Sequence, residues 1–311
     1  MSSSKSMIEI FGLNPPKQLP IGVKYMAEHP VLPTCTNDFT DQLIGIEVEV
    51  ENTLQNDKIP LHRAWTIKED GSLRNNGREY VTAPIAAAHA PYLLKNLLKE
   101  VLDPQCCFSP RTSIHVHFNV GHYTDDQIRN IVLSYSALEP LFYRFIGRGR
   151  AKNIFCVPLI ETGLLYNLTY TPIAGIVNSW SKYTGLNLLP IGTFGTIEAR
   201  HMHGTFNVEK VSIWIRLWCK LIKWSVSLKT KELQSRLSDL RGDTQVVKWL
   251  HEVFESDWEF LKYRGYGDLK RSLTNLCLAD ATEKIYKEIV VERDTQKSPW
   301  FKFKVSSSKG L

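Results

Sequence analysis

Residues 43–51 read LIGIEVEVE, and the apolar and acidic side chains that alternate along this segment indicate the fold class. Successive side chains of a β-strand point to opposite faces of a sheet, so the alternation predicts a strand with one buried face. The predicted buried face carries Ile44, Ile46, Val48 and Val50. The other face carries three carboxylates, those of Glu47, Glu49 and Glu51. The stretch therefore predicts a sheet that is apolar on one side and acidic on the other.

Two further segments, SIHVHFNV at 113–120 and GTIEAR at 195–200, show the same alternation. In the first segment the predicted buried face carries Ile114, Val116, Phe118 and Val120, and the polar face carries Ser113, His115, His117 and Asn119. In the second segment Ile197 and Ala199 are expected to be buried, opposite Thr196, Glu198 and Arg200. Three predicted strands thus have matching polar faces.

The chemistry of these polar faces favours a metal site. Carboxylates two positions apart on one strand face lie roughly 7 Å apart, and their repulsion destabilises the sheet unless a cation neutralises it. Glutamate oxygens with one or two imidazole nitrogens suit Mg²⁺ or Mn²⁺, whereas a structural zinc site would favour cysteine. A solvated sheet face is the simpler reading of any single strand of this kind, but three matching strands favour the metal.

Size and composition are those of a globular protein. The chain has 311 residues, 43% of them hydrophobic, which is enough to bury a full core. No apolar run approaches the roughly 18 residues that span a bilayer, and the N-terminus lacks a signal-peptide segment, so we expect a cytoplasmic protein with no membrane partner. A net charge of +6 and a pI near 8.9 favour acidic partners such as nucleotide phosphates but do not demand nucleic acid. The six cysteines show no C-x-x-C spacing and are expected to be reduced.

The N-terminal half of the chain predicts an arm followed by a sheet. Residues 1–42 contain five prolines and little periodicity, so an irregular arm is expected there. Strands are predicted over 43–52, 63–69 and 78–83, and residues 70–77 between the last two contain the turn formers Asp, Gly and Asn. These signals predict a compact antiparallel sheet.

The rest of the chain is expected to be mainly helical. Helical spacing of apolar residues predicts helices over 84–102, 124–147, 207–228, 243–255 and 280–292. The stretch between 148 and 200 is expected to be rich in strands, and the tail 306–311 to be disordered. This predicts three parts: the arm 1–42, a core 43–230, and a helical C-terminal extension 231–311 packed on the core.

Five fragments follow one another in an order that resembles a known family. They are GIEVE at 45–49, DGSL at 70–73, GREYVTAP at 77–84, IHVH at 114–117 and TIEAR at 196–200. In this order they resemble the amidoligase family of the glutamine synthetase and glutamate–cysteine ligase superfamily, over about residues 43–230. The resemblance implies an α+β fold like the glutamine synthetase catalytic domain, a curved antiparallel β-sheet with helices on its convex face. It also implies that ATP and Mg²⁺ or Mn²⁺ bind the concave face.

The resemblance also implies a reaction. In these ligases a carboxylate attacks the γ-phosphate of ATP to give an acyl phosphate, and an amine then displaces the phosphate to form an amide. The expected partners are therefore a small-molecule or peptide carboxylate and an amine. Related genes occur in bacteria and phages beside a glutamine amidotransferase, which would be a protein partner that supplies ammonia.

Five positions of this chain match metal ligands of the family that it resembles. Glu47 and Glu49 match a strand pair in which each glutamate binds a different ion. Glu79 matches the glutamate that completes the ion nearer the substrate carboxylate, and it is also an expected catalytic residue. His115 and Glu198 match ligands of the ion nearer the ATP phosphates.

Other positions match residues for the nucleotide and for catalysis. His117 and Asn119 would face the nucleotide, and Arg200 would steady the transferred phosphoryl group with its fixed fork of donors. Asp70 would bind an ion or orient the incoming amine, unless it is a plain turn aspartate. Arg150 would hold phosphate or the substrate carboxylate, unless it only complements the end of the preceding helix.

Three other functions remain open from the sequence. A kinase of the same superfamily would stop at phosphoryl transfer, and a metal-dependent hydrolase would use a metal-bound hydroxide without ATP. A non-catalytic protein could use the positive charge to bind nucleic acid or have a structural role. ATP binding with Mg²⁺ separates the ligase from the hydrolase, and an affinity that falls steeply with salt would identify a DNA-binding protein.

Overall fold

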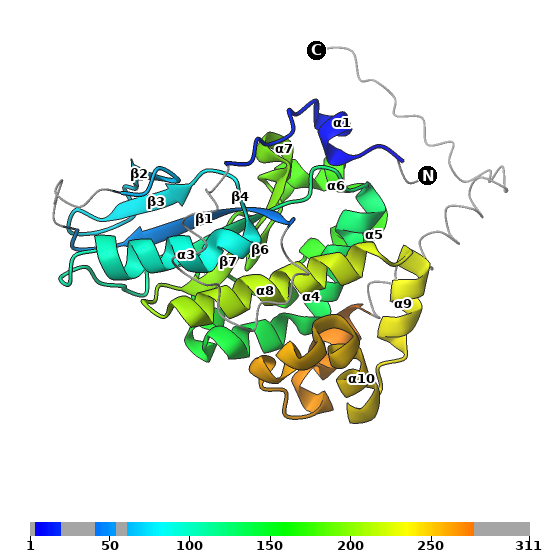
Figure 1. Cartoon of the computed structure of the whole chain (residues 1–311). Helices are drawn as coiled ribbons and strands as arrows, with labels where there is room; N and C mark the ends of the chain where they lie inside the picture. The colour runs from blue at the N-terminus through cyan, green and yellow to red at the C-terminus, as the bar shows by residue number, and fades with distance from the viewer. Residues whose placement is uncertain (1–3, 20–40, 54–60, 277–311) are drawn as a thin grey trace, which may run out of the picture.

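The protein has an α+β fold in which a seven-stranded antiparallel sheet packs against helices (Figure 1). The computed structural model describes residues 4–19, 41–53 and 61–276. Six strands follow the order β2-β3-β1-β5-β7-β6, and the short β4 pairs with the beginning of β1. The strands are β1 Leu43–Val50, β2 Trp65–Glu69, β3 Arg78–Thr82, β4 Ile85–Ala86, β5 Ser113–Asn119, β6 Leu186–Asn187 and β7 Thr196–His203. The predicted α+β class and antiparallel sheet are confirmed.

The apolar face of the sheet packs on three helices, α3 (Ala90–Lys95), α4 (Asp125–Ile146) and α8 (Val208–Val226) (Figure 1). Trp218 of α8 stacks on Phe118 of β5 and on Tyr135 of α4, with ring centroids 5.7 and 4.7 Å apart. All the apolar side chains predicted to face inward from the three polar-faced strands are buried. Strand alternation therefore puts the polar side chains on the opposite face, away from these helices.

Local signals at turns and helix ends are confirmed. Strands β2 and β3 form an antiparallel hairpin, and Asn75 and Asn76 in the connection have positive φ angles of 51° and 55°. Asparagine tolerates this conformation better than most residues. Helix α4 begins with a capping box at Thr124, and α8 begins at Asn207, whose side chain accepts a hydrogen bond from Lys210 N.

The prediction that residues 148–200 are rich in strands is wrong outside β6 and β7. The segment forms short helices, α5 (Leu164–Tyr170), α6 (Ile173–Ile176) and α7 (Ile191–Phe194), together with 3₁₀ turns. Three prolines, Pro158, Pro172 and Pro190, each stand directly before a helical turn. Proline has no N–H for a strand ladder, and its fixed φ suits the start of a helix.

The helix predicted over 84–102 begins later than expected. Ile85 joins β4, a 3₁₀ turn follows at 87–89, and α3 begins at Ala90 with Pro91 in its first turn. A π-helical turn over 96–101 continues the element. In the described part of the N-terminal arm, residues 7–11 form a short helix, α1 (Met7–Phe11), which is capped by Ser6.

The C-terminal region is helical, as predicted. It contains α9 (Thr230–Ser238), which the sequence analysis did not predict, α10 (Asp243–Phe254) and 3₁₀ segments over 255–261 and 266–268. The helix predicted at 280–292 and the tail 306–311 lie outside the described residues. Among the described residues no helix is long and apolar enough to cross a membrane, and the four described cysteines form no disulfide.

Candidate metal centre

Strand register brings the acidic and imidazole side chains of four strands into one row. Glu47 of β1 lies opposite His115 of β5, and His117 lies opposite Glu198 of β7. On the other edge of β1, Glu49 lies opposite Glu79 of β3. Because partners across an antiparallel pair point to the same face, these side chains share the polar face of the sheet.

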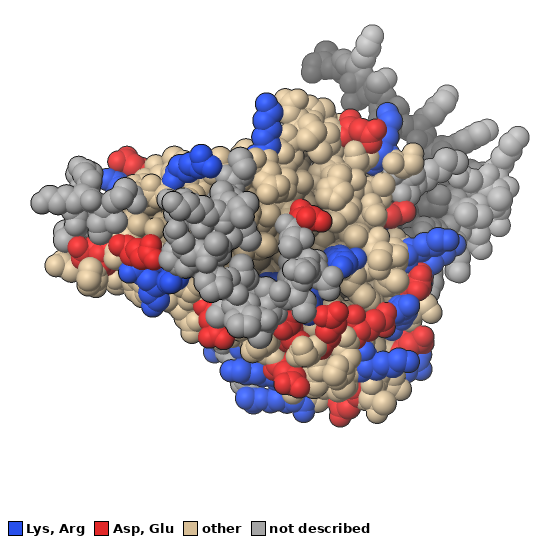
Figure 2. Space-filling view, viewed as in Figure 1, with Lys and Arg blue, Asp and Glu red and all other residues tan. Residues whose placement is uncertain are grey.

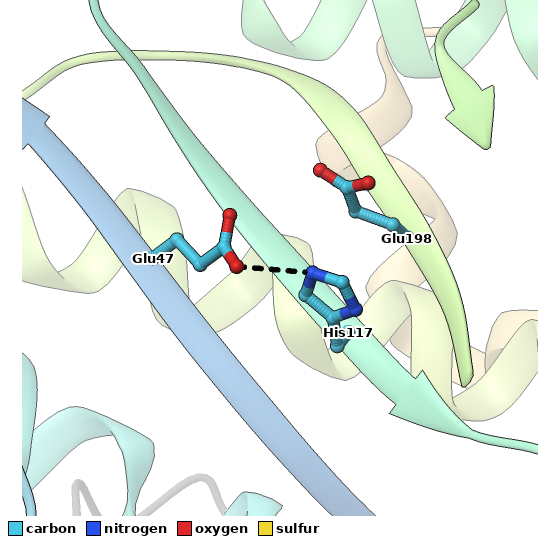
Figure 3. A group of neighbouring side chains, drawn as sticks. All are labelled: Glu47, His117 and Glu198. Carbon is cyan, nitrogen blue, oxygen red and sulfur yellow. Dashed lines mark ion pairs between the residues drawn. The ribbon is translucent and has the colours of Figure 1, made fainter. Parts of the chain in front are cut away.

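Three of these side chains form a group that could hold a metal ion. Glu47, His117 and Glu198 each offer one ligand atom, and these atoms lie within 4.8 Å of one another. They come from β1, β5 and β7 and point toward one another (Figure 3). His117 Nε2 lies 3.2 Å from Glu47 Oε1. The histidine of this group was expected to face a nucleotide rather than to belong to the ligand set.

The expected ligand His115 lies beside this group and is only 3% exposed. Its Nδ1 is 3.2 Å from Glu198 Oε1 and 3.4 Å from Glu47 Oε2. Its Nε2 lies 2.7 Å from Ser113 Oγ, and Ser113 Oγ donates to Glu49 Oε2 at 2.7 Å. Nδ1 of His115 therefore lies beside two carboxylates, and it can serve as a metal ligand in the tautomer that carries the ring proton on Nε2. A cation between these atoms would satisfy all three.

Uncharged side chains orient the candidate metal ligands Glu198 and His117 through hydrogen bonds. Asn187 of β6 donates from Nδ2 to Glu198 Oε2 at 2.7 Å, which directs Oε1 of that carboxylate toward the cluster. Thr196 Oγ1 lies 3.0 Å from His117 Nδ1 and fixes the ring. Such supporting hydrogen bonds are typical of metal sites, where they set ligand orientation and basicity.

The pKa values of Glu47 and Glu79 are shifted in opposite directions by their surroundings. Burial alone would raise the pKa of Glu47, but hydrogen bonds from His115 and His117 outweigh it and hold that pKa well below its usual range. Burial raises the pKa of Glu79 to about 7, and the charges of Glu47 and Glu49 add to the rise. Carboxylates therefore crowd one another here, and a divalent cation would relieve their repulsion.

Arg200 contributes the positive charge of the cluster. Its Nη1 donates a hydrogen bond to Glu198, whereas its buried Nε has no hydrogen-bond partner among the described residues. A buried donor without a partner is costly, and an incoming anion would satisfy it. The donor set of carboxylates, imidazoles and a guanidinium therefore fits both a divalent cation and a phosphate.

Three predicted site residues are engaged in local structure. Asp70 lies in the β2–β3 turn, where its Oδ1 accepts from Ser72 N at 2.8 Å, as in a plain turn aspartate. Arg150 is buried and donates to the backbone carbonyls of Pro110, Arg200 and His201. Asn119 is at the end of β5, and its Oδ1 accepts from Gly121 N at 3.2 Å. Within the described part of the chain, none of these hydrogen bonds joins the three residues to the glutamate and histidine cluster.

His201 of β7 lies on the apolar face of the sheet. It is fully buried among the rings of α4 and α8, and burial lowers its pKa to about 3. The register between β5 and β7 shifts between Ile114 and Val116, which is a β-bulge opposite His115. The bulge lets His201 and Met202 both be buried, because the extra residue breaks the strict alternation.

Three residues that orient the ligands, Ser113, Thr196 and Asn187, were not among the predicted site residues. The alternation had already placed Ser113 and Thr196 on the polar face, so their position was a usable signal. Asn187 reaches Glu198 only because β6 pairs with β7. No local pattern in the sequence predicts that pairing.

No protein-family model matches this chain, and no curated protein matches it. The geometry of the site is therefore the basis for assigning a function.

Proposed function

We propose that the protein is an ATP-dependent carboxylate–amine ligase that requires Mg²⁺ or Mn²⁺. The observation that carries the proposal is the convergence of acidic, imidazole and guanidinium groups from β1, β3, β5 and β7 on the sheet face turned away from α3, α4 and α8. The order of strand motifs that resembles the amidoligase family supports the same reaction. A curved sheet with helices on its convex face, as in glutamine synthetase, is part of the proposal.

The candidate metal ligands form two groups on the polar face of the sheet. Glu47, His117 and Glu198 would hold one ion, with His115 beside them. Glu49 and Glu79, which lie opposite each other on β1 and β3, are suited to a second ion. Bound ions would neutralise the charge between a carboxylate substrate and a triphosphate, which otherwise repel each other.

The side chains of the chain itself position the reactants. The free Nε donor of Arg200 suits the γ-phosphoryl group of ATP. A carboxylate oxygen of the substrate forms a bond to the γ-phosphorus while the bond to the bridging oxygen of ADP breaks. The amine nitrogen then bonds to the acyl carbon, inorganic phosphate leaves, and the amine loses a proton. Rigid strands suit this chemistry, because phosphoryl transfer depends mainly on positioning and electrostatics.

The metal part of the proposal can be tested by titrating Mn²⁺ calorimetrically into the wild type and the Glu198→Gln variant. We expect one or two bound ions in the wild type and an affinity at least about tenfold lower in the variant, because an anionic ligand is lost. Glu69→Gln is the matched control, since this glutamate is on β2 of the same sheet with a side chain that is 86% exposed. Equal Mn²⁺ binding by wild type and Glu198→Gln would reject the site.

The nucleotide part is tested by titrating a non-hydrolysable ATP analogue in the presence of Mg²⁺. The ligase should bind it, whereas a metal-dependent hydrolase should not. On the face shown in Figure 2, acidic and basic side chains alternate over the lower helices and do not form one basic patch, which does not favour nucleic acid as the ligand on that face. A screen of carboxylates and amines for ATP consumption and phosphate release then identifies the substrates.

A further inference from the structure

An exposed aromatic ring stands directly beside the candidate metal centre. Phe194 is the last residue of α7, and 67% of it is exposed, although a phenyl ring gains most when it is buried. Its ring lies edge-on to His117, with centroids 6.4 Å apart and an interplanar angle of 84°. His117 belongs to the metal-binding group, so the ring flanks the place where the phosphates of a nucleotide are proposed to bind.

Neighbouring elements support the backbone that carries Phe194. Gly195 has a left-handed conformation with φ 66°, and its carbonyl accepts a hydrogen bond from Val120 N at 2.9 Å. This turn connects α7 directly to β7, the strand that carries Glu198. Helix α1 packs against α7, where Phe11 approaches Gly192. Because the ring projects from a supported turn, it can receive a flat ligand without rearrangement of the chain.

We infer that Phe194 is the platform on which the base of the nucleotide stacks. An exposed aromatic face binds a nucleobase by π-stacking and van der Waals contact, and each such stack contributes substantially to affinity. The metal centre binds the phosphate end of the same molecule, so the two contacts act on opposite ends of one ligand. The inference deepens the proposed function and rests on it, because it takes ATP as the substrate of that site.

The experiment compares ATP with tripolyphosphate, which has the phosphates but no base. Both are titrated with Mg²⁺ into the wild type and the Phe194→Ala, Phe194→Tyr and Phe260→Ala variants. In the wild type, ATP should bind at least about tenfold more tightly than tripolyphosphate. Phe194→Ala should remove that difference while the affinity for tripolyphosphate stays unchanged, and Phe194→Tyr should keep it. Phe260→Ala is the matched control, because this exposed phenylalanine is in the C-terminal 3₁₀ segment.

The outcomes separate the inference from the proposed function. If ATP binds and Phe194→Ala retains the full preference for ATP over tripolyphosphate, the inference is overturned and the ligase proposal stands. Equal affinities of the wild type for ATP and tripolyphosphate would overturn it as well. If neither ligand binds the wild type with Mg²⁺, the proposed function fails and the inference fails with it.

Discussion

Asn187 shows how an uncharged residue can control a charged site. Its amide holds one oxygen of Glu198 and leaves the other facing His115 and Arg200. We predict that Asn187→Ala lowers the affinity for Mn²⁺ by roughly tenfold or more, since loss of a supporting hydrogen bond usually weakens metal binding by about 10–100-fold. Calorimetry measures this effect, and Asn153→Ala, which removes an exposed bond to a backbone carbonyl, is the control. An unchanged affinity would show that Glu198 needs no such support.

Glu139 predicts a dependence of stability on pH that is independent of the metal. It is 1% exposed, and burial raises its pKa to about 7 even though the amides of Leu159 and Ile160 donate to its oxygens. The pKa of the Glu139 carboxyl is near 4.5 in the unfolded chain and about 7 in the folded chain. Between these pH values the unfolded state therefore binds fewer protons than the folded state. Stability should therefore fall as pH rises through this window, by about 3 kcal/mol in all.

The measurement is the free energy of unfolding of the wild type and Glu139→Gln in urea, from pH 4 to pH 8. Glutamine keeps an acceptor for Leu159 N and does not ionise, so the difference between the two proteins isolates this carboxyl. The wild type should lose stability relative to the variant as pH increases. A constant difference across the range would show that the carboxyl is ionised at a normal pKa.

At the scale of elements, a buried ion pair connects α8 to the 3₁₀ segment 255–261. Arg216 makes a bidentate contact with Asp257, at 2.8 and 2.6 Å, and Lys220 Nζ lies 2.8 Å from the same carboxylate. The side chains of Arg216 and Asp257 are both 10% exposed. We predict that Asp257→Ala lowers the free energy of unfolding by roughly 3 kcal/mol or more, because the buried guanidinium of Arg216 would lose the carboxylate that it contacts.

A surface pair in the same region provides the control for this prediction. Arg236 of α9 and Glu252 of α10 form an ion pair with side chains that are 39% and 41% exposed. Solvent screens such pairs, so Glu252→Gln should change the free energy of unfolding by less than about 1 kcal/mol. Urea unfolding of both variants makes the comparison. Similar losses in the two variants would mean that burial does not govern the strength of the α8 contact.

At the scale of the whole molecule, one hydrophobic core joins the sheet to the C-terminal helices. The cluster of buried apolar residues extends from Met7 to Leu276. The rings of Phe142 in α4 and Phe254 in α10 lie 6.3 Å apart, and those of Trp224 in α8 and Trp249 in α10 lie 5.9 Å apart. Among the described residues, the segments on both sides of residue 230 therefore share one core.

A shared core predicts cooperative unfolding of the whole chain. Near-ultraviolet circular dichroism reports the packing of the tryptophans, and far-ultraviolet circular dichroism reports the helices and strands. In a urea titration both signals should change at one midpoint, because neither part retains a core without the other. Two separate midpoints would show that the C-terminal region folds independently.

Elements with a long, regular pattern of apolar residues were predicted correctly from the sequence, whereas short elements were not. Alternation predicted β1, β5 and β7 and their buried faces, and the helical spacing of apolar residues predicted α4 and α8. The short helices between 148 and 195 were not predicted, since three or four apolar residues fit a strand or a helix equally well. The prolines at their starts were the available signal.

The two-residue period of a strand is a local property, so the amino-acid order already indicated which side chains of β1, β5 and β7 face the core, except at the β-bulge of β7. Which polar side chains meet depends on how the strands pair. The pairing of β5 with β7 sets His117 opposite Glu198, and the pairing with β1 sets His115 opposite Glu47. Register depends on contacts between segments more than 60 residues apart in the chain, as the bond from Ser113 to Glu49 shows. No local pattern contains that information, and for this reason His117 was assigned to the nucleotide rather than to the metal group.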